Sequence, residues 1–450
     1  MRLLLGQTGY LGSPSTCHSF KVGSTVLIML LPYWSAYNLP TCPGVPSVRS
    51  LTTVGPPASE QPGSLDTRCI DISDLSQLGQ TQVECKYLTS VAPRVPPPLV
   101  LLLLRTLQRA SINPEYKESL PDGRSRGLPD LMSHEKNIEK SVERREAFLA
   151  YLPVVSACVG DKYSQADLWV NFCRCGSSSN FFRTILFKCC VFRLLINSTE
   201  LTDGMGNSIG TALSLGLSDL DHSCAPNCNV AFVGASVEVR SLPGEGQVTW
   251  ENARISYLSE VLPTSERRER LERQYYFKCK CCKCSEDGDE LVSGAALCQK
   301  CGLPVAVTNE SCNKCGEEVA GEARIAGAFL SLDGEDDLER WRRLSKLYHP
   351  LDWRMVELGE TAMADALGAG KLKVFLEIGK TLLEKSYRTH LHPYSLSLGL
   401  HLAKLSKAAI FLELEMEGLE MLKEAMNIFT LALGEDSALV EYCRALRHTI

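Results

Sequence analysis

The sequence predicts an α+β protein with a β-rich middle and an all-α C-terminal part. From Asn197 to Tyr257, short β-type runs alternate with Gly, Asn and Asp turns. Residues 336–450 have a helical, amphipathic pattern throughout. The 450 residues include 20 cysteines, and ten of these lie from Cys224 to Cys315, where the two parts meet. A length of 450 residues, of which 44% are hydrophobic and 22% charged, excludes a mainly disordered chain and a disulfide mini-protein. The net charge of −6 gives no global indication of nucleic-acid or anionic-membrane binding.

Residues 1–83 form an atypical segment that we expect to be poorly ordered. From Met1 to Arg68 only six side chains are charged, whereas eight positions are Pro and seven are Gly, and no helix or strand period persists. The start MRLLLGQTGY has too short an apolar run for a signal peptide. The runs Thr25–Trp34 and Leu99–Leu104 are shorter than the roughly 20 residues that span a bilayer. We therefore expect both runs to be buried core, and no membrane association.

The next elements are a helical region, a strand region and a charged helix. Within residues 84–196, helices are predicted over Leu99–Ala110 and Ser133–Leu152. Within residues 197–262, Val230–Phe232 and Ser236–Ser241 are predicted strands. Thr264–Phe277 opens residues 263–290 and is predicted to be a helix with Glu–Arg pairs at i,i+4 spacing.

That helix leads into a cysteine cluster that indicates a first zinc site. Cys279, Cys281 and Cys284 supply three thiolates within a very short run, and a closed zinc site needs four ligands. Cys282 is too close to its neighbours to be the fourth ligand, so either Cys224 or Cys228 is expected to supply it.

Residues 291–335 contain a second set of cysteines with zinc spacing. Two Cys-x-x-Cys-Gly knuckles place Cys298, Cys301, Cys312 and Cys315 at the spacing of a zinc ribbon. The glycine after each knuckle lets the backbone fold back toward the sulfur atoms. A closed four-cysteine site leaves no open position for chemistry, so a structural role is expected.

Residues 336–450 contain a weak internal repeat. The pair His349-Pro350 recurs as His392-Pro393, and each pair is followed by an amphipathic segment. A period of roughly 40 residues favours stacked helix pairs that bury a shared core. An unrepeated helical bundle is the alternative.

The run Asp221-His222-Ser223-Cys224-Ala225-Pro226-Asn227-Cys228 is the most distinctive motif of the chain. It is followed by two predicted strands, then Ile255-Ser256-Tyr257, Leu262–Arg268 and Gln274–Phe277 before the cysteine cluster. In this order the segments resemble the SET domain of the SET-and-MYND (SMYD) family of protein-lysine methyltransferases. The resemblance implies a SET core over 197–262, a post-SET zinc segment over 263–290 and a C-terminal domain like tetratricopeptide repeats (TPR-like). It also implies that 84–196 combine a degenerate MYND exit with the helical region inserted in the SET domain.

The resemblance implies a role for individual residues. Asn197, Asp221, His222, Tyr257 and Phe277 would hold S-adenosylmethionine, and Tyr257 would be the catalytic tyrosine. Cys224 would be the fourth ligand of the first zinc ion. The substrate would be a protein that presents a lysine, on a histone tail or another protein, and the helical domain could bind a further protein. The location implied is the cytoplasm and nucleus, where thiols stay reduced.

The chain also departs from the family pattern. Residues 1–83 contain no Gly-x-Gly cofactor loop, and the cysteines up to Cys85 lack the pairing of a MYND zinc module. The stretch Cys175–Cys190 resembles an insertion, Asp221 stands where the family has Asn, and Gly244–Trp250 replaces a Gly-Glu-Glu-Leu run.

These departures leave three interpretations open. The chain is a divergent methyltransferase, an inactive zinc-stabilised scaffold or adaptor, or an incorrectly assembled gene model of an active enzyme. A pure adaptor that uses its zinc ribbon and helical repeats belongs to a different functional class. The basic run Arg267–Lys283 is interleaved with Glu residues, so a solvated helix face is preferred over direct nucleic-acid binding.

Overall fold

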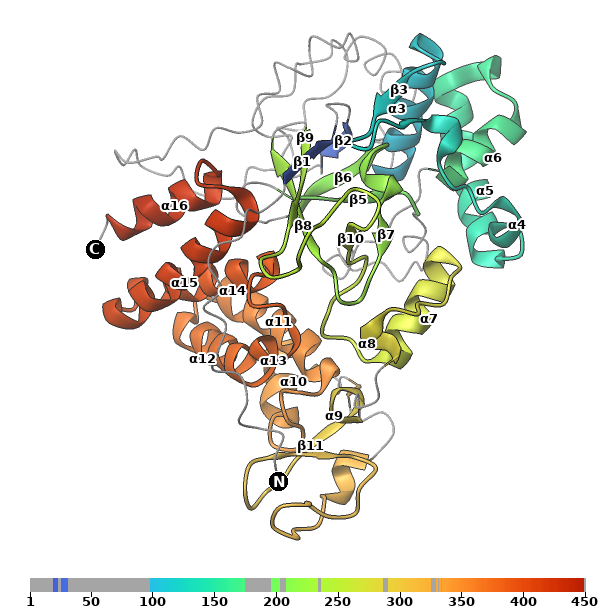
Figure 1. Ribbon diagram of the computed structural model, residues 1–450. Coiled ribbons are helices and arrows are strands. Elements are labelled where there is room, and N and C mark those ends of the chain that lie inside the picture. Colours follow the sequence, from blue (N-terminus) through green and yellow to red (C-terminus); the bar gives the residue numbers. More distant parts are fainter. Residues whose placement is uncertain are drawn as a thin grey trace, which may run out of the picture.

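The structure is a computed structural model that describes residues 19–22, 26–30, 98–174, 196–202, 208–233, 236–285, 290–324, 329–330, 332 and 334–448. Small sheets lie at its centre, with helices α3 to α6 on one side and α10 to α16 on the other (Figure 1). The cysteine-rich segment around β11 lies at one end. The predicted α+β class with a helical C-terminal part is confirmed. None of the helices in the described ranges is long and apolar enough to cross a membrane.

Two three-stranded antiparallel sheets form the β-rich centre, in the orders β1-β9-β8 and β2-β6-β5. Their strands are β1 (Ser19–Val22), β2 (Val26–Leu30), β5 (Ser198–Thr202), β6 (Ser208–Ser214), β8 (Cys228–Val233) and β9 (Ser236–Ser241). The last two confirm the strands predicted over Val230–Phe232 and Ser236–Ser241. Ala212, Val237 and Val239 are completely buried, so the core of this region lies on the inner faces of the two sheets.

Strands β1 and β2 lie within residues 1–83, although no helix or strand period persists in that part of the sequence. Phe20 lies opposite Val239 in one sheet, and Ile28 lies opposite Ala212 in the other. Both strands are very short, and each pairs with a segment from a distant part of the chain. No local sequence period therefore indicates either strand. The part of the predicted MYND exit before residue 98 lies outside the described residues, as does the apparent insertion Cys175–Cys190.

A parallel pair of very short strands joins the distinctive motif to Tyr257. β7 (Asp221–His222) lies beside β10 (Arg254–Ile255). Asn227 tightens this turn, because its side-chain oxygen accepts the Arg254 N–H at 2.7 Å while its own N–H donates to the Arg254 carbonyl at 3.2 Å. Two segments that are separated by β8 and β9 in the sequence are thereby held together at the edge of the sheets.

The helices beside the sheets differ in detail from their prediction. They are α3 (Pro98–Ile112), α4 (Glu135–Ile138), α5 (Val142–Val159) and α6 (Gln165–Arg174). The single helix expected over Ser133–Leu152 is therefore two helices, because Ser141 accepts the Arg144 N–H as an N-cap and starts α5 anew. A hairpin of β3 (Lys117–Ser119) and β4 (Ser125–Gly127) separates α3 from α4.

The segment after Tyr257 carries both cysteine clusters. It contains α7 (Thr264–Tyr275), α8 (Cys282–Ser285), α9 (Glu290–Ser293), β11 (Ala295–Leu297) and β12 (Pro304–Ala306). Helix α7 ends where Tyr276 takes a left-handed conformation with φ of 62°, slightly before the end predicted at Phe277. Strands β11 and β12 form the antiparallel hairpin that presents the second set of cysteines.

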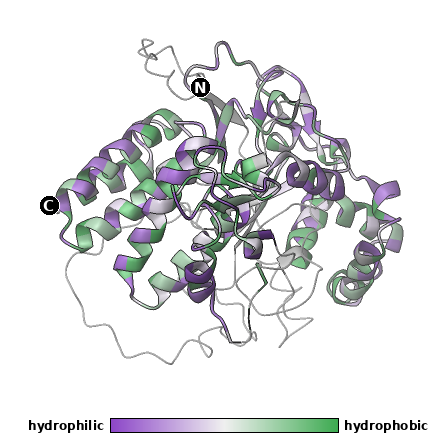
Figure 2. Ribbon diagram, turned by 90° about the horizontal axis from the view of Figure 1, so that it is seen from below, coloured by the Kyte–Doolittle hydropathy of each residue, from purple (hydrophilic) through white to green (hydrophobic). Residues whose placement is uncertain are grey.

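The C-terminal domain is built from successive helix pairs. Its helices are α10 (Asp337–Leu344), α11 (Trp353–Gly368), α12 (Leu372–Leu382), α13 (Arg388–His390), α14 (Leu396–Phe411), α15 (Glu415–Leu433) and α16 (Ala438–Arg447). Helix α11 packs on α12, and α14 packs on α15. Figure 2 shows hydrophobic and hydrophilic residues alternating along them, as expected for helices with one buried face. Helix α11 follows the first His-Pro pair and α14 follows the second, which supports the repeated-pair prediction over the unrepeated bundle.

Hydrogen bonds and an ion pair join the sheets to this helical domain. The Asn229 side chain on β8 donates to the Tyr394 carbonyl at 3.0 Å and accepts the Leu396 N–H at 3.4 Å. Arg270 on α7 pairs with Glu357 on α11 at 3.4 Å. These contacts link the parts of the chain that form the two walls of the site described below.

Candidate functional site

A cleft of about 2590 Å³ lies between the β-rich centre and the helical domain. One wall comes from the β7–β10 pair and α7, and the other comes from α11, α14 and α16. This volume exceeds the roughly 300–1,000 Å³ of a typical small-molecule pocket. The cleft therefore has room for a cofactor together with a segment of another protein.

Four of the five residues predicted to hold the cofactor line this one cleft. They are Asn197, Asp221, Tyr257 and Phe277. His222, the fifth, is not among the described residues that line it. The fold thus brings together side chains that come from well-separated parts of the sequence.

Tyr257 lies two residues after the end of β10, and its ring belongs to a group of aromatic side chains. Its ring centroid is 4.8 Å from that of Tyr275, which in turn is 6.4 Å from Phe277. The Tyr257 hydroxyl donates to the Leu220 carbonyl at 2.5 Å. Burial raises the pKa of Tyr257, and the neighbouring Tyr275 and Asp221 raise it further. The side chain is therefore a neutral phenol at physiological pH.

Asp221 places a carboxylate on the open side of the same wall. Its side chain is 80% exposed, and one oxygen lies 3.8 Å from the Arg254 guanidinium. An ion pair this exposed is screened by water and contributes little to stability. The carboxylate is therefore available to a cationic ligand in the cleft.

His222 is the next residue, and its ring points in another direction. Its Nδ1 atom accepts the backbone N–H of Tyr257 at 3.0 Å, and its Nε2 atom lies 3.1 Å from the Cys224 sulfur. Burial, with a smaller contribution from the nearby Arg267 charge, lowers the pKa of His222 to about 4. The ring is therefore neutral at physiological pH and carries one proton.

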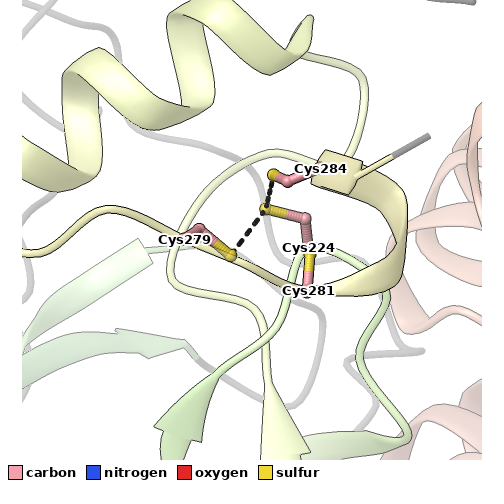
Figure 3. A group of neighbouring side chains, drawn as sticks. All are labelled: Cys224, Cys279, Cys281 and Cys284. Atoms are coloured by element: carbon pink, nitrogen blue, oxygen red, sulfur yellow. Dashed lines mark hydrogen bonds between the residues drawn. The ribbon is translucent and has the colours of Figure 1, made fainter. Parts of the chain in front are cut away.

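Cys224, Cys279, Cys281 and Cys284 converge in one cluster (Figure 3). Their sulfur atoms all lie within 4.8 Å of one another, which suits the four thiolates of a tetrahedral zinc site. Cys224 is thus the fourth member of the group, whereas Cys228 packs in the core of the sheets. The side chain of Cys282 is exposed and outside the cluster, as its position in the sequence predicts.

A buried arginine braces this cluster. Arg267 on α7 is only 1% exposed, and its guanidinium donates to the Leu262 carbonyl and to the Thr264 hydroxyl. The same group lies 3.7 Å from the Cys284 sulfur. The charge of this buried cation favours the thiolate form that binds a metal, although burial and the neighbouring cysteines raise the pKa of the Cys224 thiol.

The second cluster brings together the four cysteines of the predicted zinc ribbon. The sulfur atoms of Cys298, Cys301, Cys312 and Cys315 also lie within 4.8 Å of one another. Gly302 and Gly316 follow the two knuckles with φ of 67° and 76°. Their N–H groups donate back to the carbonyls of Cys298 and Cys312 at 2.9 Å, so the left-handed conformation needed there explains both glycines. With all four positions taken by protein, this site suits a structural ion.

The structure adds two residues that the sequence reasoning did not single out as site residues. Tyr275 lines the cleft between Tyr257 and Phe277, and its place shortly before Phe277 in the Gln274–Phe277 run was the available signal. His134 also lines the cleft and takes a left-handed conformation with φ of 50°. Nothing in the charged sequence around His134 marks it, since it reaches the cleft only through packing.

Comparison with known proteins supports the resemblance. A 249-residue stretch is 26% identical to the N-lysine methyltransferase SMYD2 of Homo sapiens, covering 53% of this chain and 55% of that protein. The N-lysine methyltransferase SMYD2-A of Danio rerio is 26% identical over 260 residues, covering 54% of this chain and 56% of that protein. The SET domain and MYND-type zinc finger protein 6 of Schizosaccharomyces pombe is 31% identical over 132 residues, covering 29% of this chain and 26% of that protein.

The extent of these matches is partial. The aligned region spans about half the length of the SMYD2 proteins, and no protein-family model matches the chain. The matches nevertheless agree with the cysteine cluster that ties the Asp221–Cys228 run to the segment after α7. Sequence and geometry together show that this chain is related to the SET-and-MYND (SMYD) family.

Proposed function

We propose that the chain is an S-adenosylmethionine-dependent protein-lysine N-methyltransferase that acts on lysines of histone or non-histone proteins. The observation that carries the proposal is the convergence of Tyr257, Tyr275, Phe277 and Asp221 on one wall of a cleft that is large enough for a peptide. The names of the relatives support the same reaction class.

The residues of the cleft suit this cofactor. S-adenosylmethionine supplies a methyl group on a positively charged sulfonium. The exposed Asp221 carboxylate would face the ammonium group of the cofactor, and Asn197 would supply a polar contact beside it. The aromatic rings of Tyr257, Tyr275 and Phe277 attract a cation through their faces.

The chain's own residues would prepare the lysine for reaction. A free lysine has a pKa near 10.4, and an aromatic, desolvated channel shifts it toward the neutral amine that can react. Because the Tyr257 proton is engaged with the Leu220 carbonyl, the phenol oxygen is left to accept a hydrogen bond from the amine. Tyr257 would therefore orient the amine rather than remove its proton, and orientation carries much of the rate of such a transfer.

Calorimetry with S-adenosylmethionine on the purified chain tests the proposal. We expect saturable binding that the charge reversal Asp221→Arg weakens, whereas Asp161→Arg on the exposed surface beyond α5 leaves it unchanged. Absence of binding by the wild-type chain would contradict the enzyme proposal.

A scaffold function is the second candidate, and two observations favour it. The Gly-x-Gly loop is absent from residues 1–83. The helical wall also presents Leu367 and Phe411 to the cleft, and Phe411 is 77% exposed. A chain that binds a protein partner on this wall but not S-adenosylmethionine would favour the scaffold. For either candidate we propose the cytoplasm and nucleus, where the eight clustered cysteines stay reduced and able to bind zinc.

A further inference from the structure

The ring of His222 makes two hydrogen bonds inside the protein, one from each nitrogen atom. One partner is the backbone of Tyr257, and the other is the sulfur of Cys224, a member of the first cysteine cluster. The aromatic residues Tyr257 and Phe277 flank the ring, with centroids 5.2 and 6.1 Å from its own. The imidazole therefore lies between the zinc cluster and the aromatic wall of the cleft.

The geometry determines which nitrogen carries the proton. A backbone N–H always donates, so Nδ1 must accept from Tyr257 and is unprotonated. The proton of the neutral ring then resides on Nε2, which donates it to the Cys224 sulfur. A donor at this position stabilises the thiolate that a metal requires. Since both nitrogen atoms are engaged, neither is free to hold a cofactor.

We propose that His222 is a positioning residue that couples the Cys224 zinc site to Tyr257, and that its ring does not contact the cofactor. The metal would coordinate the Cys224 sulfur. That sulfur would accept a hydrogen bond from the Nε2–H of His222, and Nδ1 of the same ring would accept one from the backbone N–H of Tyr257. The inference rests on the zinc site and on the proposed role of Tyr257, but it is testable without any methyl transfer.

Two conservative variants separate the two contacts. In His222→Asn the side-chain oxygen lies about as far from the backbone as Nδ1, so it can still accept the Tyr257 N–H but cannot reach Cys224. In His222→Gln the amide N–H₂ lies about as far out as Nε2, so it can still donate to the Cys224 sulfur while the contact with Tyr257 is lost. Each variant therefore serves as the control for the other.

The first measurement is zinc release to a colorimetric chelator. We expect release from the Cys224 cluster to be about tenfold faster in His222→Asn and close to wild type in His222→Gln. The zinc of the Cys298 cluster provides an internal control, and its release should be the same in all three proteins. The second measurement is hydrogen exchange at the Tyr257 amide, with the opposite expectation: faster in His222→Gln and close to wild type in His222→Asn.

The outcomes separate this inference from the proposed function. Equal behaviour of the two variants in both measurements would overturn it, as would a purified chain without zinc at the Cys224 cluster. If the wild-type chain binds S-adenosylmethionine, its affinity should be unchanged in His222→Gln while kcat falls; a weaker affinity with unchanged exchange at Tyr257 would mean that the ring contacts the cofactor. If the wild-type chain does not bind S-adenosylmethionine, the proposed function fails, but the release and exchange measurements still decide the role of His222.

Discussion

At the residue scale, the main feature of the site is that hydrogen bonds fix Tyr257 at both its backbone and its hydroxyl. Its backbone N–H is bound by His222, and its hydroxyl is bound by the Leu220 carbonyl. The residues on either side of Asp221 thus fix the phenol, while Asp221 itself projects a carboxylate toward solvent. A single tight turn therefore supplies both the support of the aromatic wall and its charge.

Removal of the phenol oxygen should impair turnover more than it impairs folding. We expect Tyr257→Phe to lower the free energy of unfolding by about 1 kcal/mol, since one buried hydrogen bond is lost. Methyl-transfer kcat should fall about 100-fold, because the oxygen that orients the amine is absent. Tyr163→Phe is the matched control, since it removes a similar bond, from the Tyr163 hydroxyl to the Leu107 carbonyl, away from the cleft. An equal kcat in Tyr257→Phe and wild type would show that the Tyr257 hydroxyl has no role in the reaction.

A buried histidine should make folding stability depend on pH. Burial lowers the pKa of His401 on α14 to about 4, against about 6.5 in an unfolded chain. Between these two values the unfolded state binds more protons, so stability is lost as the pH falls from 6.5 toward 4. We expect His401→Gln to reduce the loss of stability between pH 7 and pH 5 by about 2 kcal/mol in urea titrations. The same titration of His448→Gln, at an exposed position, should follow the wild-type pH dependence; a similar reduction in both variants would argue against the assignment.

At the scale of elements, the zinc ribbon is an integral part of the helical domain. The Leu297 N–H on β11 donates to the Leu347 carbonyl, and the His349 N–H donates to the Ala295 carbonyl, both at 2.8 Å. Asp352, completely buried, accepts the Ala295 N–H at 3.2 Å and also the Arg354 N–H at the start of α11. The ribbon is thereby hydrogen-bonded to Asp352, the N-cap of α11.

Loss of zinc from the Cys298 cluster should therefore weaken the hydrogen bonds at the start of α11. We expect Cys301→Ser to reduce the zinc content from about two ions per chain to about one, because a closed site needs all four thiolates. Hydrogen exchange in the first turn of α11 should accelerate, since the Asp352 cap loses its ordered partner. Cys282→Ser removes an exposed thiol outside both clusters and should change neither measurement. Unchanged exchange in α11 after zinc loss would show that the ribbon and the helix are independent.

At the scale of the whole molecule, the cleft exists because two separate cores are held side by side. The helical domain has one continuous core, and the sheets have another. Asn229 and the Arg270–Glu357 ion pair cross between them. Apolar packing also joins the two parts, since Val261 beside the cleft lies in the core of the helical domain and β9 packs against α15.

Asn229→Ala should weaken the association between the β-rich centre and the helical domain. Loss of two hydrogen bonds lowers the unfolding free energy by about 1–3 kcal/mol and should separate the urea transitions of the two halves. Small-angle X-ray scattering should show a larger radius of gyration. Asn427→Ala on the exposed face of α15 is the control, and an identical scattering profile for both variants would contradict the role assigned to Asn229.

Residue types and spacing alone determined the ligand chemistry and the helical C-terminal domain, since cysteine knuckles and amphipathic helices are local patterns. The run from Asp221 to Cys228 was also evident in the sequence, and the family resemblance that it carries located Tyr257. Spacing left Cys224 and Cys228 as alternatives and the resemblance favoured Cys224; the tertiary structure places Cys224 in the first cluster and Cys228 in the sheet core. It also placed β1 and β2 in the sheets and turned the His222 ring away from the cleft. These outcomes depend on contacts between distant segments, and a short segment carries no local signal of the partner it will meet.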